Sequence, residues 1–190
     1  TLTGALLQKL LAYNVPVVVG DTKHLPAGML LATEGNILQQ KHQQAQVSAD
    51  NRKQKRLWQQ TVRAKIVNQA TALELRGQEA ATLHRLAKEV TPGDADNCEA
   101  AAAQYYWPRL FDDKSFRRTR EGPWPNNLLN YGYSVLRAQT ARALVAAGLL
   151  PALGIFHRNQ YNAYPLADDL MEPFRSWIDL AVAIHIETAN

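Results

Sequence analysis

An imidazole and a group of carboxylates come close together late in the chain. His157 precedes the segment 166–175, in which Asp168 and Asp169 lie four and three residues before Glu172. If that segment is helical, the three acids can converge on one face. Carboxylates held so close repel one another, and a divalent cation is the most direct way to neutralise them. Mg²⁺ and Mn²⁺ prefer carboxylate oxygens, and Mn²⁺ also accepts an imidazole nitrogen, which His157 would supply.

The same residues also allow a structural interpretation. Asp168 and Asp169 favour a helix N-terminus after the preceding proline, and His157 could pack at a turn. Spacing alone does not choose between this interpretation and a metal site. The common motifs for nucleotide or acyl-transfer chemistry are absent: the chain has no Gly-rich phosphate loop, no Cys-x-x-Cys pair and no Gly-x-Ser-x-Gly turn.

The charge layout is more informative than the net charge of +4 over 190 residues. Residues 51–65 contain six Lys or Arg and no acid, whereas residues 166–190 contain five acids and one base, Arg175. A basic stretch can neutralise phosphates, and a tight acidic group is what a hard divalent cation requires. Together they indicate metal chemistry on a polyanion, with a solvated helix face as the alternative for the basic stretch.

Composition excludes two broad classes of protein. A single cysteine, Cys98, cannot form an internal disulfide, and the acid beside it would raise its thiol pKa, so we expect a structural cysteine in a cytoplasmic protein. The longest uncharged apolar run, residues 143–156, is too short to span a membrane and is interrupted by Gly148 and Pro151. The chain starts at Thr1 without an initiator Met, so we expect a fragment.

Periodicity and turn residues predict an α+β chain with its strands near the start. The predicted elements are a helix over 2–13, strands over 15–19 and 29–33, two or three helices over 36–90, and a helix over 128–147. Ser48 and Asp50 are the expected restart caps inside 36–90, and Gly77 is an expected stop. Thr91, as a cap before Pro92, predicts a further helix that carries Glu99 and ends near Pro108. Residues 109–126 read as a basic loop.

A resemblance to a known family then gives these residues a function. The run Leu128-Leu129-Asn130-Tyr131-Gly132-Tyr133, the run 142–154, His157-Arg158-Asn159 and the segment 166–175 resemble the CRISPR-associated integrase that captures new spacers. The match is to the branch found beside single-protein effector nucleases, and it covers nearly the whole chain. Residues 1–35 are similar to the end of that family's N-terminal β-rich domain, and residues 36–190 to most of its all-helical catalytic domain.

The resemblance implies a metal site made of three side chains. Its ligands map onto Glu99, His157 and Glu172, with Mg²⁺ or Mn²⁺ as the cofactor. Asp168 and Asp169 would then support those ligands or face DNA. Ala100 stands where the family usually has a glycine after the glutamate, and we expect it to fit. Independently, two carboxylates and one imidazole leave several positions of an octahedral ion open, as a catalytic site requires.

The resemblance also implies the reaction and the partners. The protein would join the 3′ hydroxyl of a captured DNA fragment to a phosphodiester of the repeat array, and would cut branched DNA. Expected partners are DNA that is double-stranded, branched or carries 3′ overhangs, a second copy of the chain, and the small second CRISPR adaptation protein. The candidate phosphate contacts are Arg117, Arg118, Arg120, Arg158 and Arg175.

Two other functions stay open from the residues alone. One is a non-catalytic helical module that binds or scaffolds DNA and whose acids serve only as caps and ion pairs. The other is a glycosidase with Glu99 and Glu172 as its acid/base pair, which leaves His157 and the basic loop without a role.

Val17–Val19 is expected to be an apolar strand edge that is either covered by a partner chain or disordered.

Overall fold

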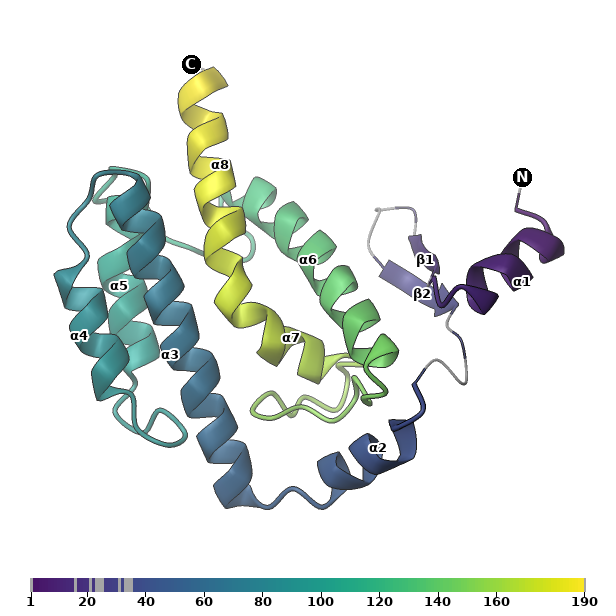
Figure 1. Ribbon diagram of the computed structural model, residues 1–190. Helices are drawn as coiled ribbons and strands as arrows, with labels where there is room; N and C mark the ends of the chain where they lie inside the picture. The colour runs from purple at the N-terminus through teal and green to yellow at the C-terminus, as the bar shows by residue number, and fades with distance from the viewer. Residues whose placement is uncertain are drawn as a thin grey trace.

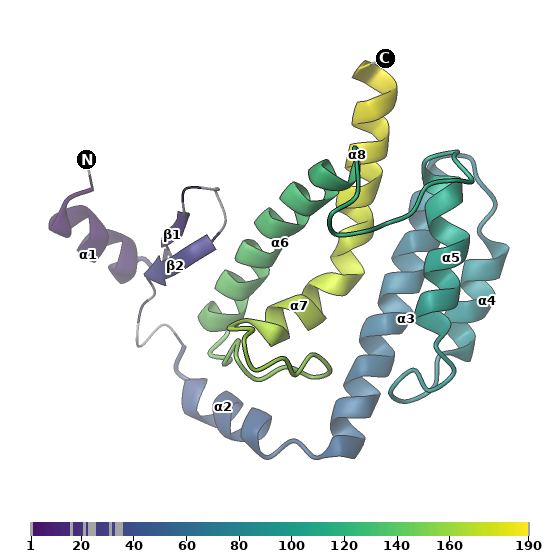
Figure 2. The ribbon, with the colours of Figure 1, turned by 180° about the vertical axis from the view of Figure 1, so that it is seen from behind.

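A computed structural model provides the three-dimensional structure, which describes residues 2–15, 17–20, 22, 26–30, 32 and 36–189. Figure 1 and, from behind, Figure 2 show a helical body with a small N-terminal unit beside it. The elements in chain order are α1 (Gly4–Ala12), β1 (Val17–Gly20), β2 (Pro26–Leu30), α2 (Gln39–Val47), α3 (Asn51–Leu75), α4 (Ala81–Glu89), α5 (Cys98–Leu110), α6 (Asn126–Ala146), α7 (Pro165–Met171), η1 (Glu172–Phe174) and α8 (Arg175–Ala189). None of the helices described combines the length and the apolar character that crossing a bilayer demands.

The N-terminal unit contains α1 and the two short strands. Thr3 caps α1 by accepting a hydrogen bond from the Leu6 amide, as the prediction of a helix here required. Strands β1 and β2 pair antiparallel, with Val17 opposite Leu30, but β2 starts and ends three residues before the predicted range 29–33. Val19 is 54% exposed. Membership of these strands in a larger β-rich domain, and a partner chain over them, stay predictions.

Three helices form between residues 36 and 90, as predicted. Asp50 caps α3, because its Oδ1 accepts a hydrogen bond of 2.7 Å from the Lys53 amide. Gly77 has a φ of 69° just after the end of α3, which is the left-handed conformation that a glycine adopts easily. Helix α2 lies against the C-terminal end of α6, where Gln46 hydrogen-bonds both the amide and the carbonyl of Leu150.

The predicted start of the next helix is wrong. Thr91 and Pro92 precede two turns, and α5 begins only at Cys98. The cap comes instead from Asp94, whose carboxylate accepts hydrogen bonds from the amides of Cys98 and Glu99 at 2.9 and 3.0 Å. An acid that satisfies free amides at a helix start fixes the first turn, so Asp94 sets the position of Glu99.

The helices form two groups that meet at α8. Helices α3, α4 and α5 enclose one apolar core, into which Leu180 and Ala183 of α8 insert. Helices α6, α7 and α8 form the second group, and Figures 1 and 2 both show α8 next to α6 on one side and α3 on the other. Helix α8 therefore holds together the two halves of the helical body.

A buried carboxylate ties α8 to its neighbours on both sides. Asp179 accepts hydrogen bonds from the hydroxyls of Tyr106 on α5, at 3.2 Å, and of Tyr133 on α6. Burial raises the pKa of Asp179 to about 7, although these hydrogen bonds and Arg175 favour its charged form. The folded protein therefore holds a proton on Asp179 at pH values where the unfolded chain has lost it.

This proton makes stability fall with rising pH. Between about pH 4 and pH 7 the folded state binds more protons at this position than the unfolded state, so the free energy of unfolding decreases as pH rises through that window. Asp179→Asn removes the titrating group, and we expect the difference between pH 5 and pH 8 to shrink by about 2 to 4 kcal/mol. Urea unfolding at the two pH values measures it. An equal pH dependence of the free energy of unfolding in the wild type and in Asp179→Asn would contradict this assignment.

Candidate metal and nucleic-acid site

One lysine joins two carboxylates from distant parts of the chain. Lys65 Nζ on α3 lies 2.5 Å from Glu99 Oε1 and 2.6 Å from Glu172 Oε2. The lysine side chain is 14% exposed and that of Glu172 only 6%. The structure therefore brings together two of the three predicted ligands, with a cation between them.

Glu172 has a second cationic partner. Its Oε1 accepts a hydrogen bond of 2.5 Å from Arg175, whose guanidinium lies 4.1 Å from the ring centre of Tyr133. Burial raises the pKa of Glu172, but the charges of Lys65 and Arg175 outweigh burial and hold that pKa below its usual value. Glu172 is therefore a carboxylate in the folded protein at neutral pH.

The third predicted ligand, His157, is held by a different acid. Its Nδ1 lies 2.6 Å from Asp169 Oδ1. Asp169 is completely buried and also accepts hydrogen bonds from the backbone amides of Ile155, Phe156 and His157. A carboxylate on Nδ1 places the proton there and leaves Nε2 as the free lone pair, which is the usual arrangement behind a metal-bound or catalytic histidine. Asp169 thus fixes both the loop and the ring.

Hydrogen bonding to Asp169 raises the pKa of His157, against a smaller opposing effect of burial. Asp168, the neighbouring acid, turns the other way. It accepts two hydrogen bonds from Arg137 on α6, at 2.5 and 3.2 Å, and one of 2.6 Å from Asn162. The three acids of 168–172 therefore do not all meet: Asp168, bound to α6, and Glu172, bound to Lys65 of α3, line one cleft, whereas Asp169 is buried against the 155–157 loop.

His157 and Glu172 line a common polar cleft of about 1070 Å³. Its walls come from the 118–121 loop, α6, the 157–162 loop, α7 and the start of α8. The charged side chains that line it are Arg118, Arg120, Glu121, Arg137, His157, Asp168, Glu172 and Arg175. Glu99 does not line this cleft and is linked to it through Lys65 and Glu172.

The oxygen and nitrogen donors of these side chains suit a divalent cation, but the side chains are not arranged around one point. Glu172 Oε2 is buried against the Lys65 ammonium, which lies 2.6 Å away. A carboxylate oxygen that faces a cation at this point also suits a divalent ion. In the described part of the chain, however, no three His, Cys, Asp or Glu side chains are gathered in a metal-binding arrangement. The ligand set Glu99, His157 and Glu172 therefore stays a prediction.

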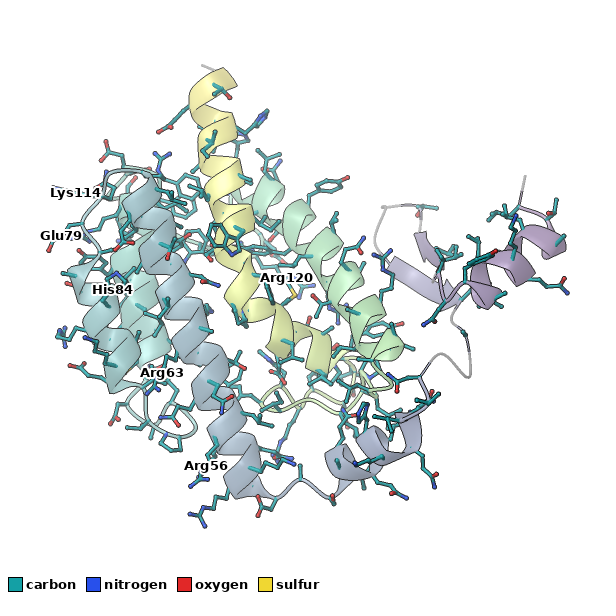
Figure 3. All side chains as sticks on the ribbon, in the orientation of Figure 1. Arg56, Arg63, Glu79, His84, Lys114 and Arg120 are labelled. Atoms are coloured by element: carbon teal, nitrogen blue, oxygen red, sulfur yellow. The ribbon has the colours of Figure 1, made fainter. Side chains whose placement is uncertain are left out.

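The predicted phosphate-binding arginines differ in whether their guanidinium groups already have hydrogen-bond partners within the protein. Arg117 and Arg118 donate to their own loop, and Arg118 also binds Asn126 and Asn130. Arg158 donates to Gln54, and Arg175 to Glu172. Arg120 is exposed at the cleft, and within the described residues its guanidinium has no hydrogen bond or ion pair. Figure 3 labels this side chain.

The basic run 51–65 also divides. Arg63 donates to the Ala87 carbonyl on α4, and Lys65 binds the two carboxylates, whereas Arg52, Lys53 and Arg56 are exposed. Arg56 projects outward at the lower end of α3 in Figure 3. Neither a uniform solvated face nor a uniform phosphate-binding face describes this stretch.

Sequence reasoning missed Lys65, and a signal for it exists. Lys65 falls on the same helical face as Trp58, Val62 and Gln69, which are all buried. A lysine on a buried face needs an acidic partner. Asp169 was expected to support the ligands or face DNA; in the structure it bonds the His157 ring and three backbone amides, and the role of that ring as a ligand stays a prediction.

Comparisons with known proteins agree with this architecture. The family model described as "CRISPR associated protein Cas1" matches residues 1–189. The chain is 41% identical over 187 residues to the CRISPR-associated endonuclease Cas1 of Neisseria meningitidis serogroup C (strain 8013). The aligned region covers 97% of this chain and 60% of that relative. The chain thus spans about 60% of the length of this relative.

Solved structures share the fold. A casposase bound to an integration product superposes with a TM-score of 0.74 at 27% identity, over 100% of this chain and 58% of that one. A partial Cas6-RT-Cas1–Cas2 complex gives a TM-score of 0.74 at 22% identity, over 99% of this chain and 63% of that one. The second likeness shows the fold alone.

The hydrogen bond between Asp169 and His157 predicts a titration shift. In Asp169→Asn the ring loses its charged partner, so the pKa of His157 should fall toward or below its ordinary value. Histidine proton shifts followed by NMR across pH 5 to 9 measure this. Asp168→Asn is the matched control, because that acid bonds Arg137 and not the imidazole. A pKa that stays raised in Asp169→Asn, or falls equally in both variants, would contradict the assignment.

Proposed function

The chain belongs to the Cas1 family of CRISPR-associated proteins, and we propose that it is a metal-dependent DNA endonuclease and integrase of CRISPR adaptation. Residues 36–190 would form the helical catalytic domain, and residues 1–35 the end of an N-terminal β-rich domain. The substrate would be DNA that is branched or carries 3′ overhangs. The partners would be a second copy of the chain and the small second adaptation protein.

The meeting of Glu99 and Glu172 is the observation that carries this proposal. The two acids are 73 residues apart in sequence and come from α5 and η1, yet they bind one ammonium. Two carboxylates held this close, one buried and one 28% exposed, repel each other unless a cation accompanies them. A module whose acids serve only as helix caps and ion pairs also accommodates Lys65 between the two acids, but it leaves the oriented His157 ring beside Glu172 without a role.

The reaction that fits this site is transfer of a phosphodiester. The 3′ oxygen of the captured DNA forms a new bond to phosphorus while the bond to the leaving oxygen breaks, and no covalent bond to the protein is needed. Mg²⁺ or Mn²⁺ held by Glu99, His157 and Glu172 would polarise the phosphoryl oxygen and lower the pKa of the attacking hydroxyl.

The protein's own residues supply orientation. Asp169 holds the His157 ring so that Nε2 is free, and Arg175 holds Glu172 from the side away from Lys65. Arg120 gives the cleft an unpaired positive charge for a DNA phosphate. The casposase structure, which is bound to an integration product, supports DNA as the ligand of this fold.

Removing either acid or the imidazole should abolish the chemistry. We expect Glu99→Gln, His157→Asn and Glu172→Gln each to lower cleavage of branched DNA with Mn²⁺ by a factor of about 100 or more, because each loses a ligand of the ion. Glu79→Gln removes an exposed acid between α3 and α4, labelled in Figure 3, that does not contact the site residues, and it should keep full activity.

The cleavage assay with chelator, together with a measurement of Mn²⁺ binding, separates the alternative functions. Activity that survives excess chelator would favour a glycosidase-like or other metal-free reaction. Equal, weak Mn²⁺ binding by the wild type and His157→Ala would favour a non-catalytic scaffold. If Glu172→Gln kept full activity, the ligand assignment would be wrong.

Arg120 should contribute to binding and not to the metal site. Arg120→Ala is expected to weaken binding of duplex DNA uniformly across sequences and to reduce the slope of log affinity against log salt by about 1. Fluorescence anisotropy at several salt concentrations measures both quantities. Arg63 is a poor phosphate contact because it donates to the Ala87 carbonyl on α4. Arg63→Ala should therefore leave the slope unchanged. An unchanged slope in Arg120→Ala would exclude this contact.

A further inference from the structure

Lys65 has a position that neither the reaction nor the predicted ligand set explains. It is a nearly buried cation on α3, and its ammonium touches both acids of the proposed site. A lysine ammonium is a compact charge with three donors, so it can bridge two carboxylates from different helices. Without it, Glu99 and Glu172 would face each other as like charges in a poorly hydrated place.

Lys65 contacts the two acids at nearly equal distances, because its ammonium lies 2.5 Å from Glu99 Oε1 and 2.6 Å from Glu172 Oε2. Glu172 keeps Arg175 on its other oxygen. Glu172 would therefore retain a positive partner if Lys65 moved away.

We propose that Lys65 is an internal counterion that occupies the place of the divalent cation and leaves both carboxylates when that cation binds. The ammonium and a divalent cation compete for the same two oxygens, and repulsion between their charges prevents both from contacting those oxygens together. This inference rests on the proposed function, because it takes Glu99 and Glu172 as ligands.

The displaced ammonium has an evident new partner. Glu172 lines the cleft in which a phosphodiester would lie, and Lys65, which does not itself line that cleft, contacts Glu172 from behind. A phosphate oxygen is a suitable acceptor for an ammonium that has lost a carboxylate. Lys65 therefore changes from holding the empty acids together to holding the substrate beside the ion.

Mn²⁺ binding by Lys65→Met tests the proposal without any measurement of activity. Methionine keeps an unbranched apolar stem and removes the charge. The variant should bind Mn²⁺ more tightly, on the order of tenfold, as measured by electron paramagnetic resonance of the free ion. It should also unfold at a lower temperature in chelator than the wild type, and Mn²⁺ should restore more of its stability.

Matched variants isolate the charge at this position. Lys53→Met removes a lysine from the same helix, for which no ion pair is found in the described part of the chain, and it should bind Mn²⁺ like the wild type. Lys65→Arg keeps the charge and should show no gain in affinity. Lys65→Gln keeps a donor for the carboxylates and replaces Lys65→Met if that variant does not fold in chelator.

The outcomes separate this inference from the proposed function. If folded Lys65→Met or Lys65→Gln binds Mn²⁺ no more tightly than the wild type, or less tightly, Lys65 is not displaced by the ion and serves only to hold the two acids together. That result overturns the inference and leaves the proposed function standing. Wild-type protein whose Mn²⁺ binding is absent, or is unaffected by Glu172→Gln, overturns the metal site and the inference with it.

Discussion

The helical body is built around one ammonium between two carboxylates. Lys65, Glu99 and Glu172 come from α3, α5 and η1, so their ion pairs join the first helical group to the second. Glu172 would be expensive to bury without a cation, and Glu99, which is partly exposed, would repel it. Whatever occupies this point, a lysine or a metal ion, must be positive for the helices to pack as they do.

A second layer of interactions fixes what surrounds that point. Asp169 gathers three consecutive backbone amides and the His157 ring, and Arg175 is held between Glu172 and the face of Tyr133. Further back, Asp179 joins two tyrosine hydroxyls across α5 and α6. Buried polar groups that are fully bonded restrict a site to one geometry, which is what positioning a phosphodiester requires.

Local signals were sufficient to predict most helices, and insufficient for the site geometry. Asp50 and Gly77 mark real helix ends because capping depends on a few neighbouring atoms. Thr91 and Pro92 misled because Asp94, three residues later, offered a better acceptor for the free amides of α5. The predicted range of β2 was three residues too late, because the limits of a strand depend on its pairing with β1 as well as on its own residues.

Residue type and spacing pointed to His157 and Glu172, whereas Glu99 as a ligand came only from the family resemblance, because nothing local links it to residues so far along the chain. Spacing predicted that Asp168, Asp169 and Glu172 share a face, but α7 ends at Met171 and each acid finds a different cation or amide. Lys65 was hidden within a basic run, since a count of charges does not say which of them is buried. Tertiary contacts, not local pattern, decide those roles.

Diffraction from crystals soaked in Mn²⁺, recorded at a wavelength where manganese scatters anomalously, tests this account most directly. It predicts one strong peak within coordination distance of Glu99, His157 Nε2 and Glu172, with Lys65 Nζ moved off both acids. A peak elsewhere, or no peak while Lys65 still bridges the two carboxylates, would contradict it.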